Sequence, residues 1–189
     1  MIRKFRHTLS KLTVFVSFIA TTVTFSAYGQ APVANFTGTA QVGCSPLIVN
    51  FQDQSTGNPS TWSWSFGNGN TSGLKNPTAT YFTPGTYTVS LTVTNASGSN
   101  TLTRTQYITV YEAPITDFSG SPLSGCFPLR VQFSDLSTAG TGNTNVSWLW
   151  DLGNGSTSTL QNPLATYNTA GTFSVTLQVT NDKGCIKTR

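Results

Sequence analysis

The chain has 189 residues, of which 37% are hydrophobic and 12% aromatic, but only 8% are charged. Its formal net charge of +4 arises at the N-terminus, where Arg3, Lys4, Arg6 and Lys11 precede the first acidic residue, Asp53. The six basic residues that follow Lys11 balance the six acidic residues of the chain. The composition therefore excludes the basic surface that nucleic-acid binding requires, and we expect no nucleic-acid partner.

The N-terminus has the layout of a secretory signal peptide. An apolar run from Leu12 to Ala27 follows the basic residues, and the small residues Ala27 and Gly29 stand where a signal peptidase reads. Polar residues interrupt the run, which falls short of the ~20 apolar residues that span a bilayer, so a membrane anchor is the weaker alternative. We expect a signal peptide over residues 1–29, export to the cell surface or the medium, and no membrane span in the mature chain.

The sequence after this leader contains two copies of one unit. Cys44–Ser55 recurs as Cys126–Ser137 at an offset of 82, and Trp62–Asn95 recurs as Trp148–Asn181 at an offset of 86. The second copy therefore has four additional residues, which lie between Thr138 and Val146. Repetition of this kind indicates tandem domains and is sought before local structure is assigned.

Apolar and polar residues alternate within each copy, as they do in strands that place one face in a core. The first copy predicts strands at Phe36, over residues 47–51, 62–66 and 87–93, and at Ile108 and Val110. The second copy repeats the longest of these strands over residues 173–179.

Glycine-rich turns separate these strands, at Gly67-Asn68-Gly69 and Gly153-Asn154-Gly155. Short strands separated by turns predict an all-β fold with two tandem immunoglobulin-like antiparallel β-sandwiches, over residues 32–112 and 114–189.

Each copy contains a Trp-x-Trp pair. Such a pair can form a platform on which sugars stack, but Phe66 and Leu152 continue the same apolar face, which favours packing in the core. We therefore expect four structural core residues: Trp62, Trp64, Trp148 and Trp150.

The repeated unit resembles the PKD domain family, the immunoglobulin-like repeats named after the polycystic kidney disease protein. The family has a Trp-x-Phe-Gly-Asp-Gly turn, then Asn-Pro, and then a Tyr-containing turn that ends in Pro-Gly-x-Tyr before a strand and an Asn. The matching residues are Trp64, Phe66, Gly67, Gly69, Asn76, Pro77, Tyr81, Pro84, Gly85, Tyr87 and Asn95 in the first copy, and Trp150, Gly153, Gly155, Asn162, Pro163, Tyr167, Gly171, Phe173 and Asn181 in the second.

Three departures from this pattern bear on function. Asn68 and Asn154 stand where the family has the turn Asp, which weakens a calcium-binding or charge-based role for the turn, and Leu152 replaces the Phe. A threonine, Thr80 or Thr166, replaces the His often found before the turn Tyr. The resemblance implies an extracellular spacer, an adhesion module or a substrate-docking appendage, as on bacterial surface proteins and secreted hydrolases.

Three cysteines remain to be paired. Cys44 and Cys126 are equivalent in the repeat, whereas Cys185 corresponds to Ser99. We expect a disulfide between Cys126 and Cys185 that closes the second module and leaves Cys44 as a thiol; three free thiols are the alternative. Closing a loop of about 60 residues would contribute roughly 4 kcal/mol in the chain-entropy model.

The second copy lacks the counterpart of Ile108 and Val110, because Arg189 corresponds to Thr103. An antiparallel sandwich without its last strand has an open sheet edge. We expect that the chain is the N-terminal piece of a longer protein with other domains, or that another segment supplies this strand.

The titratable groups that enzymes use are scarce. The single histidine, His7, lies in the predicted leader, so Ser-His-Asp, Cys-His and histidine-based zinc sites are not expected in the mature chain. Asp53 and Asp135 are repeat-equivalent and each begins an Asp-x-Ser turn that can bond its own backbone. We expect no catalytic residue, no cofactor-binding residue and no metal site.

We therefore expect a non-catalytic extracellular binding or spacer pair that mediates adhesion or other contacts with a protein or polysaccharide through loops at the ends of the sandwiches. The longer loop from Thr138 to Val146 is the best candidate for such a contact. The alternative is an N-terminal appendage of a larger secreted hydrolase, a protease or glycosidase, whose catalytic domain lies elsewhere. Polysaccharide binding by the modules themselves is a third hypothesis.

Overall fold

The structure is a computed structural model that describes residues 29–189. The predicted signal peptide lies outside the described residues, apart from Gly29. Residues 29–189 form strands and turns, which confirms the predicted all-β class. No helix in this part of the chain is long and apolar enough to cross a membrane.

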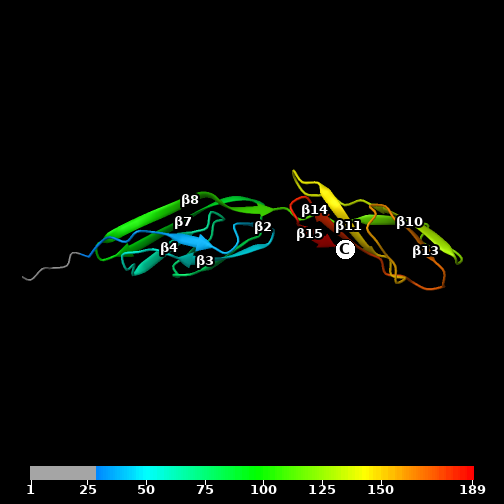
Figure 1. The fold of residues 1–189 in the computed structure, drawn as a ribbon, viewed down its shortest axis with the longest axis horizontal. Coiled ribbons are helices and arrows are strands. Elements are labelled where there is room, and N and C mark those ends of the chain that lie inside the picture. The colour runs from blue at the N-terminus through cyan, green and yellow to red at the C-terminus, as the bar shows by residue number, and fades with distance from the viewer. Residues whose placement is uncertain (1–28) are drawn as a thin grey trace, which may run out of the picture.

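Module 1, the first β-sandwich, contains eight strands in two sheets (Figure 1). One sheet has the order β1-β3-β6 and the other has the order β2-β8-β7-β4-β5. All neighbours are antiparallel except β2 and β8. The strands are β1 (Phe36–Gly38), β2 (Val42–Cys44), β3 (Leu47–Asp53), β4 (Thr61–Ser65), β5 (Thr71–Ser72), β6 (Thr78–Tyr81), β7 (Gly85–Asn95) and β8 (Gly98–Tyr111).

Module 2, the second β-sandwich, repeats this plan with fewer strands. Its sheets have the orders β13-β10-β9 and β12-β11-β14-β15, and all their neighbours are antiparallel. The strands are β9 (Phe118–Ser121), β10 (Leu129–Asp135), β11 (Asn145–Asp151), β12 (Thr157–Ser158), β13 (Leu164–Tyr167), β14 (Thr176–Asn181) and β15 (Ile186–Thr188).

The two core tryptophans hold the sheets together in the same way. Trp64 and Trp150 are 1% and 0% exposed, and each indole nitrogen donates to a main-chain carbonyl, of Leu74 or Leu160, at 2.9 Å. Rings from the opposite sheet surround each indole, and in module 1 the centroid of Phe36 lies 5.2 Å from that of Trp64. Large aromatic side chains bury roughly 150–250 Å² each and dominate the packing of such small cores.

Glycine is required at the predicted turns. Gly67 and Gly153 have φ values of +77° and +73°, and a Cβ atom there would lie 2.4 Å and 2.3 Å from the carbonyl oxygens of Thr88 and Ser174. The asparagine between the glycines donates to the carbonyl of Thr80 in module 1 and has the same role in module 2. In module 1 the turn is thus fixed by backbone geometry and amide hydrogen bonds, whereas in module 2 Oδ1 of Asp151 also accepts from the backbone nitrogen of Gly153 at 2.9 Å.

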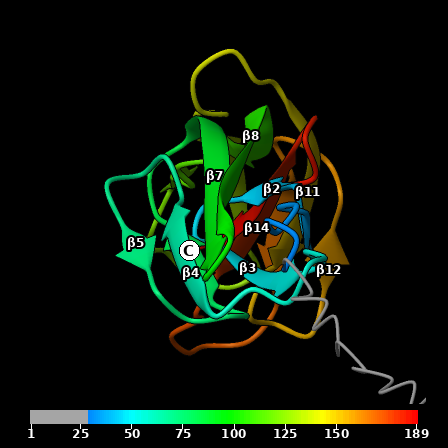
Figure 2. The same cartoon turned by 90° about the vertical axis from the view of Figure 1, so that its left-hand side faces the viewer.

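The two modules lie end to end, as Figure 1 shows. Strand β8 leads out of module 1, and β14 and β15 lie at the near end of module 2, whereas β10 and β13 lie toward its far end. Figure 2 gives the view turned by 90°, in which β7 and β8 of module 1 stand in front of β11 and β14 of module 2.

The predicted strand over residues 173–179 is shorter than expected. Strand β14 begins at Thr176, whereas its counterpart β7 begins at Gly85, the equivalent of Gly171. In module 1, residues 85–87 pair with residues 108–110 of β8. No strand of the described chain takes that place beside residues 171–175, so these residues have no ladder to join.

Candidate functional site: the junction between the modules

The modules are joined by a very short linker. Strand β8 ends at Tyr111, and module 2 begins with a bridge between Ile115 and Thr138, so Glu112, Ala113 and Pro114 are the only residues between them. A proline fixes its own φ and restricts the residue before it, which stiffens so short a connection. Few relative orientations of the modules are compatible with this linker.

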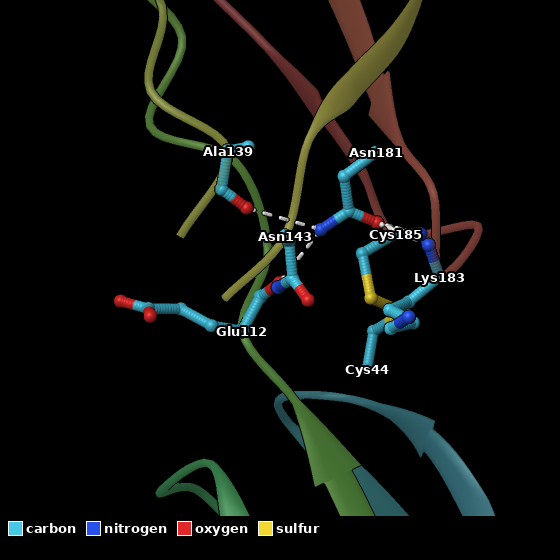
Figure 3. The surroundings of a disulfide bond; sticks show 7 residues. All are labelled: Cys44, Glu112, Ala139, Asn143, Asn181, Lys183 and Cys185. Atoms are coloured by element: carbon cyan, nitrogen blue, oxygen red, sulfur yellow. Dashed lines mark hydrogen bonds between the residues drawn. A yellow bond between two sulfur atoms is a disulfide. The ribbon is translucent and has the colours of Figure 1, made fainter. Parts of the chain in front are cut away.

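A disulfide crosses the junction beside the linker (Figure 3). Cys44 ends β2, which pairs with residues 109–111 of β8, directly before the linker. Cys185 is fully buried in the turn between β14 and β15 of module 2. The bond has a Cα–Cα distance of 5.5 Å and joins residues 141 positions apart in the sequence. The modules are therefore joined at two adjacent points, the linker and the disulfide.

The predicted pairing of Cys126 with Cys185 is wrong. Cys185 is bonded to Cys44, and Cys126 is the exposed free cysteine. The reason is the length of the last strand. In module 1, Cys44 and Ser99 are the equivalents of Cys126 and Cys185, and they lie at opposite ends of β8. At about 3.3 Å per residue that strand separates them by roughly 40 Å, far beyond the reach of a disulfide. The two positions can meet only across a junction between modules.

Asn181 fastens the linker to module 2. Its side chain is 1% exposed, and its amide nitrogen donates to the carbonyls of Glu112 and Ala139 at 2.9 and 3.2 Å. Its oxygen accepts from the backbone nitrogens of Lys183 and Cys185, at 3.1 and 2.9 Å. One buried amide thus joins the linker, the adjacent loop and the disulfide-bearing turn, with every hydrogen-bonding group satisfied (Figure 3).

The longer loop from Thr138 to Val146 contacts the same linker. The backbone nitrogen of Thr141 donates to Oε2 of Glu112 at 2.8 Å, and Gly140 packs so closely that a Cβ atom would lie 2.9 Å from the Cβ of Glu112. On the other side, Nζ of Lys183 lies 5.8 Å from the ring centroid of Tyr111. The loop that the sequence marked for ligand contact therefore lies at the junction.

The remaining predicted residues serve the sandwiches. Trp62 and Trp148 are half-buried at the edges of the cores and donate to Oδ2 of Asp53 and Asp135 at 2.9 and 2.7 Å. The other oxygen of each carboxylate accepts from the backbone of Ser55 or Ser137, as the Asp-x-Ser pattern indicates. In residues 29–189, no three His, Cys, Asp or Glu side chains gather where they could hold a metal ion.

The surroundings of Asp135 shift its pKa. Partial burial would by itself raise the pKa of Asp135, but hydrogen bonds from Ser137, Gln161 and Trp148 outweigh it and lower the pKa. The shift stabilises the ionised form, which suits a structural acceptor and is opposite to the shift of a general acid.

Two features of the junction were missed by sequence reasoning. The sequence pattern pairs Cys185 within one module, and it marks Asn181 as a family residue without indicating a structural role. For Asn181 the repeat does carry a signal, because Asn95 stands at the equivalent position of module 1. In the structure, Asn95 donates to the carbonyls of Gln30 and Gly57. These residues correspond to Glu112 and Ala139 at the offset of 82.

Comparison with known proteins places these modules in a family. The model of the PKD domain matches residues 29–110 and 111–189. The chain is 33% identical over 158 residues to the pre-pro-metalloprotease PrtV of Vibrio cholerae, covering 84% of this chain and 17% of that protein. It is also 37% identical over 73 residues to the collagenase ColQ1 of Bacillus cereus, covering 39% of this chain and 8% of the collagenase.

Solved PKD domains are among the structures to which part of this chain is similar. The crystal structure of the PKD1 domain of the Vibrio cholerae metalloprotease PrtV is 39% identical, with a TM-score of 0.38, and the match covers 43% of this chain and 98% of that domain. The chain spans less than a fifth of the length of the curated relatives that it matches.

Proposed function

The chain belongs to the PKD domain family, and from this premise we propose that its two modules form a non-catalytic extracellular spacer that holds a binding partner at a fixed distance and orientation. The observation that carries the proposal is the disulfide between Cys44 and Cys185. A bond between modules crosses from one core region to the other and restricts how the two modules are oriented. Disulfides persist in oxidising compartments, which supports export.

The disulfide also determines how the pair bears tension. When force is applied at residues 30 and 189, it passes from Cys44 directly to Cys185, and residues 45–184 lie inside the closed loop. Only residues 30–44 and 185–189 can then be drawn out. At roughly 3.5 Å per residue, the 141-residue separation keeps about 500 Å of chain out of the load path. This behaviour suits a spacer that connects a surface to a partner.

Single-molecule pulling from residues 30 and 189 tests the spacer. We expect the oxidised chain to extend only by its two short terminal segments, and the Cys44→Ser variant to release about 500 Å more as both modules unfold. Cys126→Ser is the matched control and should behave like the unmodified chain. Full extension of the oxidised chain would overturn the proposal.

A second function is favoured by the named relatives. They are a collagenase and a metalloprotease, and the chain corresponds to a small share of each. The pair would then be the appendage of a larger secreted hydrolase, in which it holds the catalytic domain near its substrate. Reading the coding sequence beyond Arg189 distinguishes the two: a protease or glycosidase motif supports the appendage, and further repeats or a sorting domain support a surface adhesin.

Contacts with an outside protein or polysaccharide remain part of the proposal. A glycan array probed with the oxidised chain tests direct polysaccharide binding by the modules. Binding to a defined glycan class would support it, and no binding would direct the search to protein partners.

A further inference from the structure

Module 2 has an open cavity of about 840 Å³, lined by both apolar and polar side chains, toward the end distant from module 1. Its walls come from the segment between β9 and β10 and from residues 171–175 that precede β14. The apolar lining side chains include Phe118, Leu123, Phe127, Leu129, Phe173 and Val175. Leu123 and Phe127 are 83% and 62% exposed, so the walls of the cavity present large apolar side chains to solvent.

The equivalent space in module 1 is filled by the end of β8. Residues 108–110 pair antiparallel with residues 85–87 of β7, and residues 109–111 pair parallel with β2 on the other side. Ile108 and Val110 enter the core, where they are 0% and 3% exposed. A strand with apolar residues at alternate positions is therefore the natural occupant of this space.

The walls of the cavity in module 2 correspond to those two partner segments. At offsets of 86 and 82, residues 85–87 and 42–44 become residues 171–173 and 124–126. Neither counterpart belongs to a strand in the described chain, although their flanking residues follow the fold of module 1. Val175 is only partly buried, whereas its equivalent Val89 is 0% exposed, so the core of module 2 is open at the place where Ile108 closes module 1.

Cys126 lies beside this cavity and adds a second observation. It is the repeat equivalent of Cys44 and it is exposed with a free thiol. Cys44 stands next to the filled space of module 1 and is bonded to the hairpin cysteine of the module that follows. The internal repeat therefore shows both what fills such a cavity and what bonds to a cysteine at its edge.

We propose that the far end of module 2 docks another module of the same kind. A strand with the Tyr-Ile-x-Val alternation of residues 107–110 enters between residues 124–126 and 171–173. A cysteine in the turn of the docked module that corresponds to the β14–β15 turn then bonds to Cys126. A second copy of this chain is not that partner, because its Cys185 is already bonded to Cys44 and is fully buried at its own junction.

The covalent step is an oxidation of two thiols. Cys126 and the docked cysteine together lose two protons and two electrons to a disulfide oxidant, such as oxidised glutathione, which is reduced to two thiols. The resulting bond would repeat the junction between modules 1 and 2, so that each module is joined to the next by a linker and a disulfide.

The cavity is tested with a peptide and the mature chain. A labelled peptide of residues 104–112 should bind saturably in fluorescence anisotropy, and Ser in place of Ile108 and Val110 in the peptide should weaken binding roughly 100-fold. On the protein, Val175→Asp should abolish binding, whereas Val146→Asp, at an exposed valine of β11, should not. Unfolding curves of both variants should show that the modules remain folded, so that a loss of binding does not come from unfolding. Equal binding of the two peptides, or no binding, would overturn the docking strand.

The disulfide is tested by a chain that carries a second copy of residues 104–189 directly after Arg189, with Ser in place of Cys126 in the added copy only. The register is kept, because Arg189 corresponds to Thr103. After refolding with oxidised and reduced glutathione, tryptic mapping should find the peptide of residues 105–130 bonded to a peptide of residues 184–187. This bond should be lost in Cys126→Ser. A bond that survives Cys126→Ser, or a Cys126 that stays fully alkylatable, would overturn the proposal.

Discussion

Modules 1 and 2 are copies of one sandwich that differ at one sheet edge. In module 1, β8 continues to Tyr111 and β2 pairs with its end, and fourteen buried residues form the core. In module 2, no strand within residues 114–189 covers the equivalent edge, and eight buried residues form the core. The comparison shows that the last strand of this fold both completes the core and prepares the surface to which the next module is bonded.

Replacing the central core tryptophan of one module should give the largest difference in stability between the two modules. Trp150→Ala leaves a large cavity and should lower the free energy of unfolding by about 3–5 kcal/mol. Because module 2 has the smaller core, we expect this variant to unfold module 2 while module 1 stays protected, whereas Trp64→Ala leaves module 2 protected. Hydrogen exchange followed by mass spectrometry resolves the two modules.

Leu149→Ala is the matched control for this experiment, since Leu149 is 46% exposed on the same strand. A change of more than about 1 kcal/mol in this control would contradict the assignment of faces on β11.

Loss of the disulfide should have the next largest effect. Cys44→Ser should lower the free energy of unfolding of the pair by roughly 2–4 kcal/mol, because the unfolded chain is no longer constrained by the cross-link. Urea denaturation without reductant measures this. Cys126→Ser should leave the midpoint unchanged, since Cys126 is exposed and unbonded. Equal destabilisation by both variants would contradict the pairing.

Asn181 and Asn95 occupy equivalent positions, so substitution of each compares its contribution to stability in the two modules. Asn181→Ala removes four hydrogen bonds and leaves buried backbone groups unpaired, which should cost about 1–3 kcal/mol. Asn95→Ala should cost less, because Asn95 is only half-buried and water can bond the groups that its side chain leaves unpaired. Thermal unfolding of the two variants gives the comparison, and a larger loss in Asn95→Ala would contradict a role for Asn181 at the junction.

The smallest expected effect is a dependence of stability on pH. The pKa of Asp135 is lowered on folding, so its contribution is present above the unfolded pKa of 3.8 and is lost as the pH falls through the lower folded value. The free energy of unfolding of Asp135→Asn should therefore fall less than that of the unmodified chain below about pH 4. Urea denaturation between pH 5 and 2 measures the difference, and parallel curves would contradict the shift.

The sandwiches could be predicted from the sequence because their signals are local. Alternation over residues 87–93, the glycines at 67 and 153 and the Trp-x-Trp pairs each specify a strand, a turn or a core position within a few residues. Strands β2, β5 and β15 are two or three residues long and carry no such pattern. They form because a longer neighbour offers them a ladder.

The junction could not be read in this way because it depends on distance in three dimensions. Cys44 and Cys185 lie 141 positions apart and meet only because β8 carries module 2 to the end of module 1 where β2 stops. The length of β8 was the missing quantity: recognising that residues 98–111 form one strand would have placed Ser99 and Cys44 at opposite ends of a module. A pairing within module 2 would then have been excluded.

Tryptic mapping without reduction tests the account most directly, because cleavage places the three cysteines in separate peptides. Cys44 lies in the peptide that ends at Lys75, Cys126 in residues 105–130 and Cys185 in residues 184–187. The account predicts that residues 184–187 are recovered bonded to the peptide that ends at Lys75. Recovery of residues 184–187 bonded to residues 105–130 of the unextended chain would contradict it.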